Sequence, residues 1–214
     1  MHSLSFDFAD LTPKERYKLL IGTVIPRPIA LITTVSPDGI PNAGAFSFFN
    51  ILTHDPAIMA VGIEYRPDGV PKDTAANILA TGEFTVHISD QALVDQMEIC
   101  SIKFPPDVDE LQVAGLETVP GETVGNPRIL AAPAAFECHL VQTVPVTPAR
   151  VIVLGEVKRM FVREGLVDPT TLHVDQIGID AVGRLGGHLY ARQLDQFERV
   201  TPSVAQFKAL TEPR

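Results

Sequence analysis

Short runs of apolar and β-branched residues, separated by turn-forming residues, predict a chain made mainly of β-strands. The most distinct hairpin has the apolar run Ile29–Val35, the turn Ser36–Gly39 and a second strand that begins at Asn42 and continues through Phe49. Later strands are expected at Ala57–Glu64, Glu83–Ile88, Ala134–Val144, Arg150–Val162 and, in short form, Asp175–Ile179. The two long runs are expected to pair through Pro145–Ala149.

Helices are expected at four places. Thr12-Pro13-Lys14-Glu15 is a capping box, and its helix is expected to end near Gly22. Lys72-Asp73-Thr74 precedes a helix over Ala75–Thr81, for which we expect a capping side chain at the start. The other two helices are expected at Asp90–Ile99 and Ser203–Leu210. The irregular stretch Ser101–Pro127 is expected to be a loop with a short helix, and its length suggests a functional or interface role.

The strands mostly follow one another directly, without alternating with helices, which favours an antiparallel β-barrel with a few appended helices. We find no internal repeat and no linker between domains. The sequence therefore predicts a single domain over residues 1–214, with a core over about residues 20–195 and a C-terminal helix over about residues 203–210.

Composition narrows the possible partners. The 214 residues are 45% hydrophobic and 20% charged with a net charge of −9, and no Lys/Arg cluster is present. A nucleic acid or an anionic membrane surface needs a concentrated basic face, so neither is an expected partner. The N-terminus is too polar for a signal peptide and no apolar run approaches a membrane span, which makes the cytoplasm the expected location. Cys100 and Cys138 fit reduced thiols there.

Familiar catalytic motifs are absent: there is no G-x-G-x-x-G after a strand, no P-loop, no H-E-x-x-H and no G-x-S-x-G. The six histidines are scattered, and His87 and His139 are expected to face outward or to be hydrogen-bonded, so no metal site is expected. The two cysteines are expected to be packing residues, with Cys138 in phase with Phe136 and Leu140.

Two stretches are candidates for ligand binding. Arg27 lies between two prolines that fix its neighbours' φ angles, and the small residues Asn42–Ala45 lead to Ser47 among phenylalanines, a combination that suits a flat ring with polar edges. A plain buried hairpin is the alternative. The segment Lys72–Thr74 offers a lysine, a hydroxyl and helix-start amides, which can bind a small anion. A simple helix cap is the alternative there.

Four motifs in order resemble the flavin reductase-like family, whose members are flavoproteins with the FMN-binding split-barrel fold. The motifs are Arg27-Pro28-Ile29-Ala30-Leu31-Ile32-Thr33-Thr34; Gly39-x-x-Asn42-x-x-x-Phe46-Ser47 with Asp55-Pro56; Lys72-Asp73-Thr74-x-x-Asn77-Ile78; and Gly183-Arg184-Leu185-Gly186-Gly187-x-x-Tyr190. The resemblance extends from about Pro26 to Arg192. It departs at Ala57, where the family often has a second proline, and over Ser101–Pro127.

The resemblance implies an antiparallel, Greek-key-like split barrel that forms a homodimer and binds one FMN, or FAD, per subunit near the interface. The implied ring-binding residues are Ala45, Phe46, Ser47, Phe48, Phe49 and Asn50. The implied phosphate and ribityl residues are Arg27, Lys72, Asp73 and Thr74, with Asn77 adjacent. His188 and Tyr190 would lie toward the open face of the flavin, where a nicotinamide or substrate could stack.

The activity implied is that of an FMN-dependent oxidoreductase, in particular an NAD(P)H:flavin reductase. Electrons would pass to free flavin, to a partner monooxygenase or to another acceptor. Two alternatives are a flavin-binding electron-transfer protein without nicotinamide activity and a barrel that serves as a binding module without a cofactor.

Overall fold

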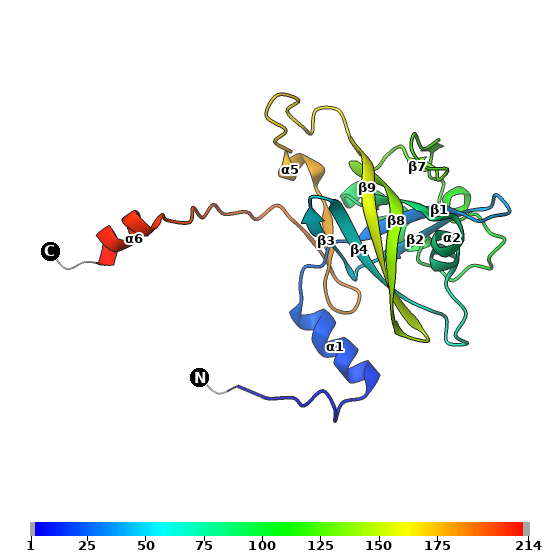
Figure 1. Ribbon diagram of the computed structural model, residues 1–214, viewed down its shortest axis with the longest axis horizontal. Helices are drawn as coiled ribbons and strands as arrows, with labels where there is room; N and C mark the ends of the chain where they lie inside the picture. Colours follow the sequence, from blue (N-terminus) through cyan, green and yellow to red (C-terminus); the bar gives the residue numbers. More distant parts are fainter. Residues whose placement is uncertain (1–2, 212–214) are drawn as a thin grey trace.

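The computed structural model describes residues 3–211, and its centre is a seven-stranded antiparallel sheet (Figure 1). The strand order is β2-β1-β5-β8-β9-β4-β3. The bounds are β1 Ala30–Val35, β2 Pro41–Phe46, β3 Phe49–His54, β4 Ala57–Glu64, β5 Glu83–Ile88, β8 Ala134–Thr147 and β9 Arg150–Val162. Two small sheets pair β6 (Thr118–Val119) with β7 (Arg128–Ile129) and β10 (Val182–Arg184) with β11 (Tyr190–Arg192).

The strands β2 and β3 are consecutive in the chain, yet they lie at opposite edges of the sheet. Only Ser47 and Phe48 separate them, so the Cα atoms of Phe46 and Phe49 are three residue steps apart, about 11 Å at most. The sheet must therefore curl until its edges approach, and the Gly62 amide of β4 donates to the Phe48 carbonyl at 2.7 Å, which extends the β3–β4 pairing into this link. The prediction of one strand continuing from Asn42 through Phe49 is wrong, because barrel closure breaks it after Phe46.

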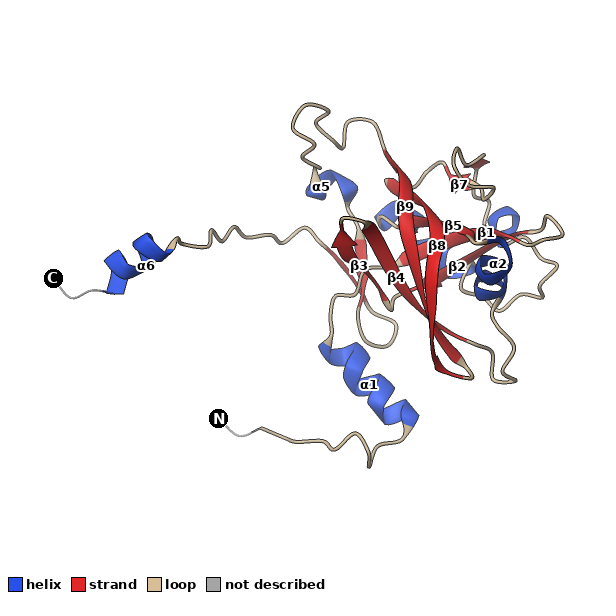
Figure 2. Cartoon of the chain, viewed as in Figure 1, coloured by secondary structure: helices blue, strands red, loops and turns tan. Residues whose placement is uncertain are grey.

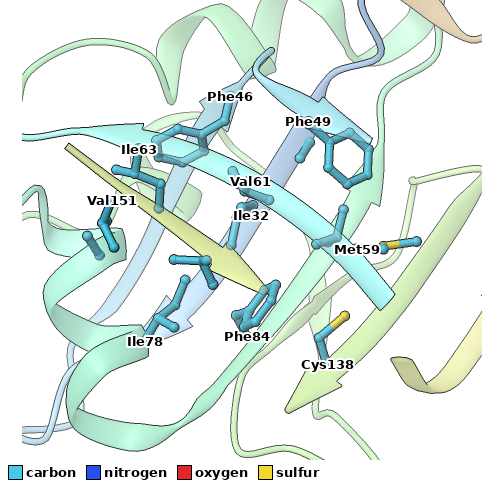
Figure 3. Packing of buried hydrophobic residues seen from close by; sticks show 14 residues of the cluster. Ile32, Phe46, Phe49, Met59, Val61, Ile63, Ile78, Phe84, Cys138 and Val151 are labelled. Carbon is cyan, nitrogen blue, oxygen red and sulfur yellow. The ribbon is translucent and has the colours of Figure 1, made fainter. Parts of the chain in front are cut away.

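The barrel interior is filled by apolar side chains from the sheet and from one helix, α2 (Asp73–Thr81) (Figure 3). Phe84 of β5 is fully buried there, and Ile78 of α2 covers one end. Phe84 has room because β9 carries Gly155 opposite it: a Cβ at Gly155 would lie 2.7 Å from a carbon of the Phe84 ring. Cys138 packs in this cluster with Phe136 and Leu140 against it, as predicted.

The strand β1 is buried on both faces. Ala30 and Ile32 point into the barrel, whereas Leu31 points to a second apolar cluster under α3 (Val94–Ile99) and α4 (Glu110–Val113). The neighbouring His87 is fully buried, with Nδ1 3.0 Å from the Leu31 carbonyl and Nε2 accepting from the Ile129 amide at 2.9 Å. This confirms a hydrogen-bonded histidine at position 87.

The helices mostly follow their local signals. The capping box begins α1 (Pro13–Thr23), and Gly82 ends α2 with a φ of 74°. The expected helix over Asp90–Ile99 is a 3₁₀ turn (Gln91–Leu93) followed by α3, and the C-terminal helix is α6 (Val204–Thr211), at the end of a segment that leaves the barrel (Figure 2).

The strand predicted over Asp175–Ile179 is wrong. Its residues form the short helix α5 (Gln176–Ile179), because the Asp175 carboxylate accepts from the Gly178 amide at 2.9 Å and so caps a helix. Among the described residues, no helix is long and apolar enough to span a bilayer.

Candidate functional site

A cavity of about 660 Å³ lies between the edge strand β2, the start of α2 and the loops that follow β4 and α3. It brings together two segments that the sequence analysis considered separately, the small residues of β2 and Lys72–Thr74. Its lining residues are Asn42, Ala43, Gly44, Ala45, Phe46, Glu64, Tyr65, Arg66, Pro67, Asp68, Lys72, Asp73, Thr74, Cys100, Ser101, Ile102, Lys103, Phe104, Glu110 and Ala149.

The floor of this cavity is the outer edge of β2. The Ala43 amide donates to the Glu110 carboxylate at 3.1 Å and is therefore directed away from β1. Outward and inward amides alternate along an antiparallel strand, so the Ala45 amide also points to the outer edge. Gly44 leaves the floor without a side chain at this position. A Cβ there would lie 2.9 Å from the Thr74 hydroxyl and 3.1 Å from the Phe46 ring, so a larger residue has no room.

A buried chain of hydrogen bonds holds this floor to α2. The Asn42 side-chain oxygen accepts from the Thr74 hydroxyl at 2.8 Å and from the Thr34 hydroxyl at 3.3 Å. Asn77 donates in turn to Thr34 at 3.0 Å. Asn77 is thus buried behind the cavity and orders its wall, as a residue adjacent to the site.

The start of α2 has free donors toward the cavity. Lys72 occupies the N-cap position without a side-chain capping bond, so the prediction of a capping side chain is wrong: the Thr74 hydroxyl donates to Asn42 instead. The first amides of a helix have no intrahelical acceptors, and they attract anions. Asp73 is paired with Arg66 at 2.6 Å.

Lys72 is the N-cap residue of α2 and places a cation at this helix start. Its ammonium lies 5.5 Å from the centroid of the Phe46 ring. Burial lowers the pKa of Lys72, the negative charge of Glu64 opposes that shift, and the positive charge of Lys103 adds to it. A cation that has lost hydration gains more than an exposed one from a bound anion.

Five further candidate residues line a second cavity of about 330 Å³ at the β2–β3 bend. It contains Arg27, Ser47, Phe48, Phe49 and Asn50, together with Leu20, Val24, Pro26 and Pro28. The two cavities share no lining residue, so the structure does not bring Arg27 and Lys72 into one cavity.

Arg27 is only 7% exposed, and its guanidinium donors are directed at protein acceptors. It donates to the Ile21 and Val24 carbonyls at the end of α1, at 2.8 and 3.0 Å, and to the Leu185 carbonyl at 3.0 Å. A longer bond, 3.4 Å, reaches the Ser47 hydroxyl. Arg27 therefore ties α1, the glycine-rich segment and the β2–β3 bend together.

His188 and Tyr190 lie at the β10–β11 hairpin, and neither lines these two cavities. His188 is exposed, while the Tyr190 hydroxyl bonds Arg184 and Glu98. Both thiols are buried: burial raises the pKa of Cys100 and of Cys138 to about 12. Within residues 3–211, no three His, Cys, Asp or Glu side chains are grouped to hold a metal ion.

Comparison with known proteins identifies the family. The model of the flavin reductase like domain matches residues 21–179. The chain belongs to the flavin reductase-like family. A Deinococcus radiodurans relative described as an uncharacterized protein is 40% identical over 220 residues, covering 100% of this chain and 96% of its own.

Solved structures of the family agree. Nitrilotriacetate monooxygenase component B from Bacillus cereus is 33% identical with a TM-score of 0.89, covering 93% of this chain and 100% of its own. The 2-nitrobenzoate 2-nitroreductase NbaA from Pseudomonas fluorescens is 32% identical with a TM-score of 0.87, covering 94% and 98%. A split-barrel protein from Shewanella frigidimarina (22% identity, TM-score 0.81, covering 94% and 100%) shows the same fold. The predicted antiparallel split barrel of the flavin reductase-like family is thus confirmed.

For this flavin reductase-like chain, sequence reasoning missed a group of cavity residues. Ser101, Lys103 and Glu110 come from the irregular stretch after α3, for which only a general functional or interface role was expected. The local signal present there is Asp109, whose carboxylate caps α4 and so places Glu110 in the first helical turn. Nothing local indicates that Glu110 is buried.

Proposed function

We propose that this chain is an FMN-binding oxidoreductase that accepts hydride from NAD(P)H and passes electrons to free flavin, a partner monooxygenase or another acceptor. The observation that carries the proposal is the cavity in which the small-residue edge of β2 faces the uncapped start of α2 and Lys72. Membership of a family that includes flavin reductases supports it.

The residues of this cavity fit the two ends of FMN. Lys72 and the first amides of α2 would hold the phosphate, because within residues 3–211 the ammonium has no ion-pair partner and no side chain caps the helix start. The low surface at Gly44 and the outward Ala45 amide would receive the ring and its polar edge, where backbone donors need no reorganisation. The Thr74 hydroxyl already donates to Asn42, so we propose that it positions the floor.

Arg27 receives a different role from the one implied by the resemblance. Its donors contact carbonyls, so we propose that it positions the β2–β3 bend, with Ser47 and Phe48, and that Lys72 serves the phosphate. FMN, when bound, supplies the hydride acceptor. The chain supplies orientation and exclusion of water, which agrees with the lack of an activated thiol at Cys100 and Cys138.

We also propose that the protein is a single domain that forms a homodimer through the face around the second cavity. Leu20, Val24 and Phe48 at this cavity are 45–60% exposed, and Ile51 and Leu52 of the adjoining β3 are about 60% exposed. An apolar face of this kind is typical of an interface between subunits. Light scattering after size-exclusion chromatography measures it: a monomer at micromolar concentration would contradict the dimer.

The test of the proposed function is an FMN titration of flavin-stripped protein followed by flavin fluorescence. The chain has no Trp, so protein emission interferes little. Saturable binding is expected, and absence of binding would refute the proposal. NAD(P)H oxidation with added FMN then separates a reductase from an electron-transfer protein without nicotinamide activity. Parallel titrations with FAD and riboflavin define which part of the flavin is recognised.

A further inference from the structure

Glu110 is a buried carboxylate that contacts the cavity floor from a distant part of the chain. It begins α4, is 4% exposed and lines the larger cavity. One of its oxygens, Oε2, accepts from the Ala43 amide at 3.1 Å and from the Asn42 side-chain amide at 3.0 Å. Burial raises the pKa of Glu110, and these hydrogen bonds oppose that rise.

The bond from the Ala43 amide to Glu110 satisfies a donor that would otherwise be unpaired, because β2 is an edge strand. The outer edge of such a strand presents amides and carbonyls that no neighbouring strand pairs. The Glu110 carboxylate accepts the hydrogen bond that a carbonyl of a further strand would otherwise accept. The next outward-facing amide along β2 is that of Ala45. The direction of the Ala45 amide therefore depends on how firmly Ala43 is held.

The same carboxylate also controls the start of α2 through Asn42. Because Glu110 accepts from the Asn42 side-chain nitrogen, the Asn42 oxygen faces the opposite way and accepts from Thr74. Thr74 belongs to the first turn of α2, beside Lys72. One carboxylate is thus hydrogen-bonded to the β2 floor of the cavity and, through Asn42, to the start of α2.

We infer that Glu110 is a positioning residue, whose carboxylate fixes the outer edge of β2 and the start of α2 in the arrangement that receives the flavin. The ligand part of this inference rests on the proposed function. The positioning part concerns the protein alone, so it can be measured without flavin.

Three substitutions separate geometry from charge. Glu110→Gln keeps a side-chain oxygen that can accept both bonds but removes the charge. Glu110→Ala removes the acceptor, and Glu110→Met removes it while keeping most of the side-chain volume, in case the alanine variant does not fold. The matched control is Glu137→Ala: Glu137 is a fully buried carboxylate that accepts from the Glu122 and Thr123 amides at 2.8 and 2.7 Å, away from both cavities.

The first measurement is amide hydrogen exchange of flavin-free protein, comparing residues 41–46 with the part of the β8–β9 hairpin over residues 142–154, which pairs away from Glu137. Without the acceptor at position 110, exchange over 41–46 should accelerate by about ten-fold or more relative to the hairpin. Glu110→Gln should retain protection, and Glu137→Ala should leave the ratio unchanged. Unchanged relative protection in both Glu110→Ala and Glu110→Met would overturn the positioning role.

The second measurement is FMN affinity of the same proteins. Loss of the acceptor should weaken binding about ten-fold or more, whereas Glu110→Gln and Glu137→Ala should stay within about three-fold of the unchanged protein. If the unchanged protein binds FMN and Glu110→Met binds it with the same affinity, the inference is overturned. Failure of the unchanged protein to bind FMN would refute the proposed function instead, and the exchange result would still decide the role of Glu110.

Discussion

Replacing Lys72 with methionine tests whether the start of α2 recognises the flavin phosphate. The substitution keeps the length and apolar stem of the side chain but removes the ammonium, which lies 5.5 Å from the Phe46 ring and has lost part of its hydration. A hydrogen bond to a charged group contributes about 1.5–3 kcal/mol, and each 1.4 kcal/mol is about one factor of ten in affinity. We therefore expect FMN to bind about ten- to a hundred-fold more weakly.

Riboflavin lacks the phosphate and is the ligand that isolates this effect. The affinity for riboflavin should fall by at most the free energy with which the ammonium holds the Phe46 ring in place. That contribution is about 0.5–1 kcal/mol, which is less than about six-fold in affinity. Fluorescence titrations of both ligands at two salt concentrations measure the difference, and salt should weaken FMN binding less in the variant. Lys158→Met is the control, since Lys158 pairs with Glu156 on the outer surface of β9.

Equal losses for FMN and riboflavin in Lys72→Met would refute the phosphate assignment and would place Lys72 near the ring instead. Arg27→Met provides the contrast. Its donors contact the Ile21, Val24 and Leu185 carbonyls, so we expect it to weaken both ligands equally by loosening the β2–β3 bend. A loss confined to FMN would return Arg27 to the phosphate site that the family resemblance implied.

Three further substitutions test the fold and the bend. Gly155→Ala should destabilise the protein by about 1–3 kcal/mol, because the new methyl group would overlap the Phe84 ring, whereas Gly22→Ala, with open space around it, should not; urea unfolding measures both. Burial lowers the pKa of His87 from 6.5 to about 4. Between about pH 6.5 and pH 4, His87 is therefore protonated in the unfolded chain but stays neutral in the native state. Stability is therefore lost as the pH falls, by up to about 3 kcal/mol, and His87→Gln should lack this component; the same pH dependence in both proteins would contradict the assignment. Ser47→Ala should lower flavin affinity or shift the flavin potential while the fold survives, because its hydroxyl accepts from Arg27 and helps to hold the bend that leads into β2; unchanged values of both would show that the Ser47 hydroxyl does not influence the flavin site.

Local chemistry was sufficient to predict most elements. Thr12 and Glu15 begin α1 through their own side chains, and the strand Glu83–Ile88 alternates its apolar residues as the barrel requires. The strand predicted at Asp175–Ile179 failed for a reason that is also local: its alternating apolar residues outweighed an aspartate that caps a helix. The Asp175 cap is itself visible in the sequence, so a local pattern was sufficient to predict a helix at this position.

The site itself depends on contacts that no local pattern contains. The break after Phe46 follows from barrel closure, and the residues on both sides of it favour β-structure. Thr74 looks like a helix cap in sequence, but its hydroxyl is taken by Asn42 from another strand. The partner that completes this network, Glu110, is an acid in an irregular stretch, and such residues are usually exposed.

The two-residue link between β2 and β3 also bears on when the site can exist during synthesis. These two strands lie at opposite edges of the sheet, and three of the five strands between them, β5, β8 and β9, come later in the chain than the link. Until the ribosome has released the chain through Val162, the two edges have no sheet to join them, and α2 has no closed barrel to cover. A nascent chain therefore carries the cavity residues of β2 and of the start of α2 well before it has a cavity, and ligand binding becomes a property of the completed barrel alone.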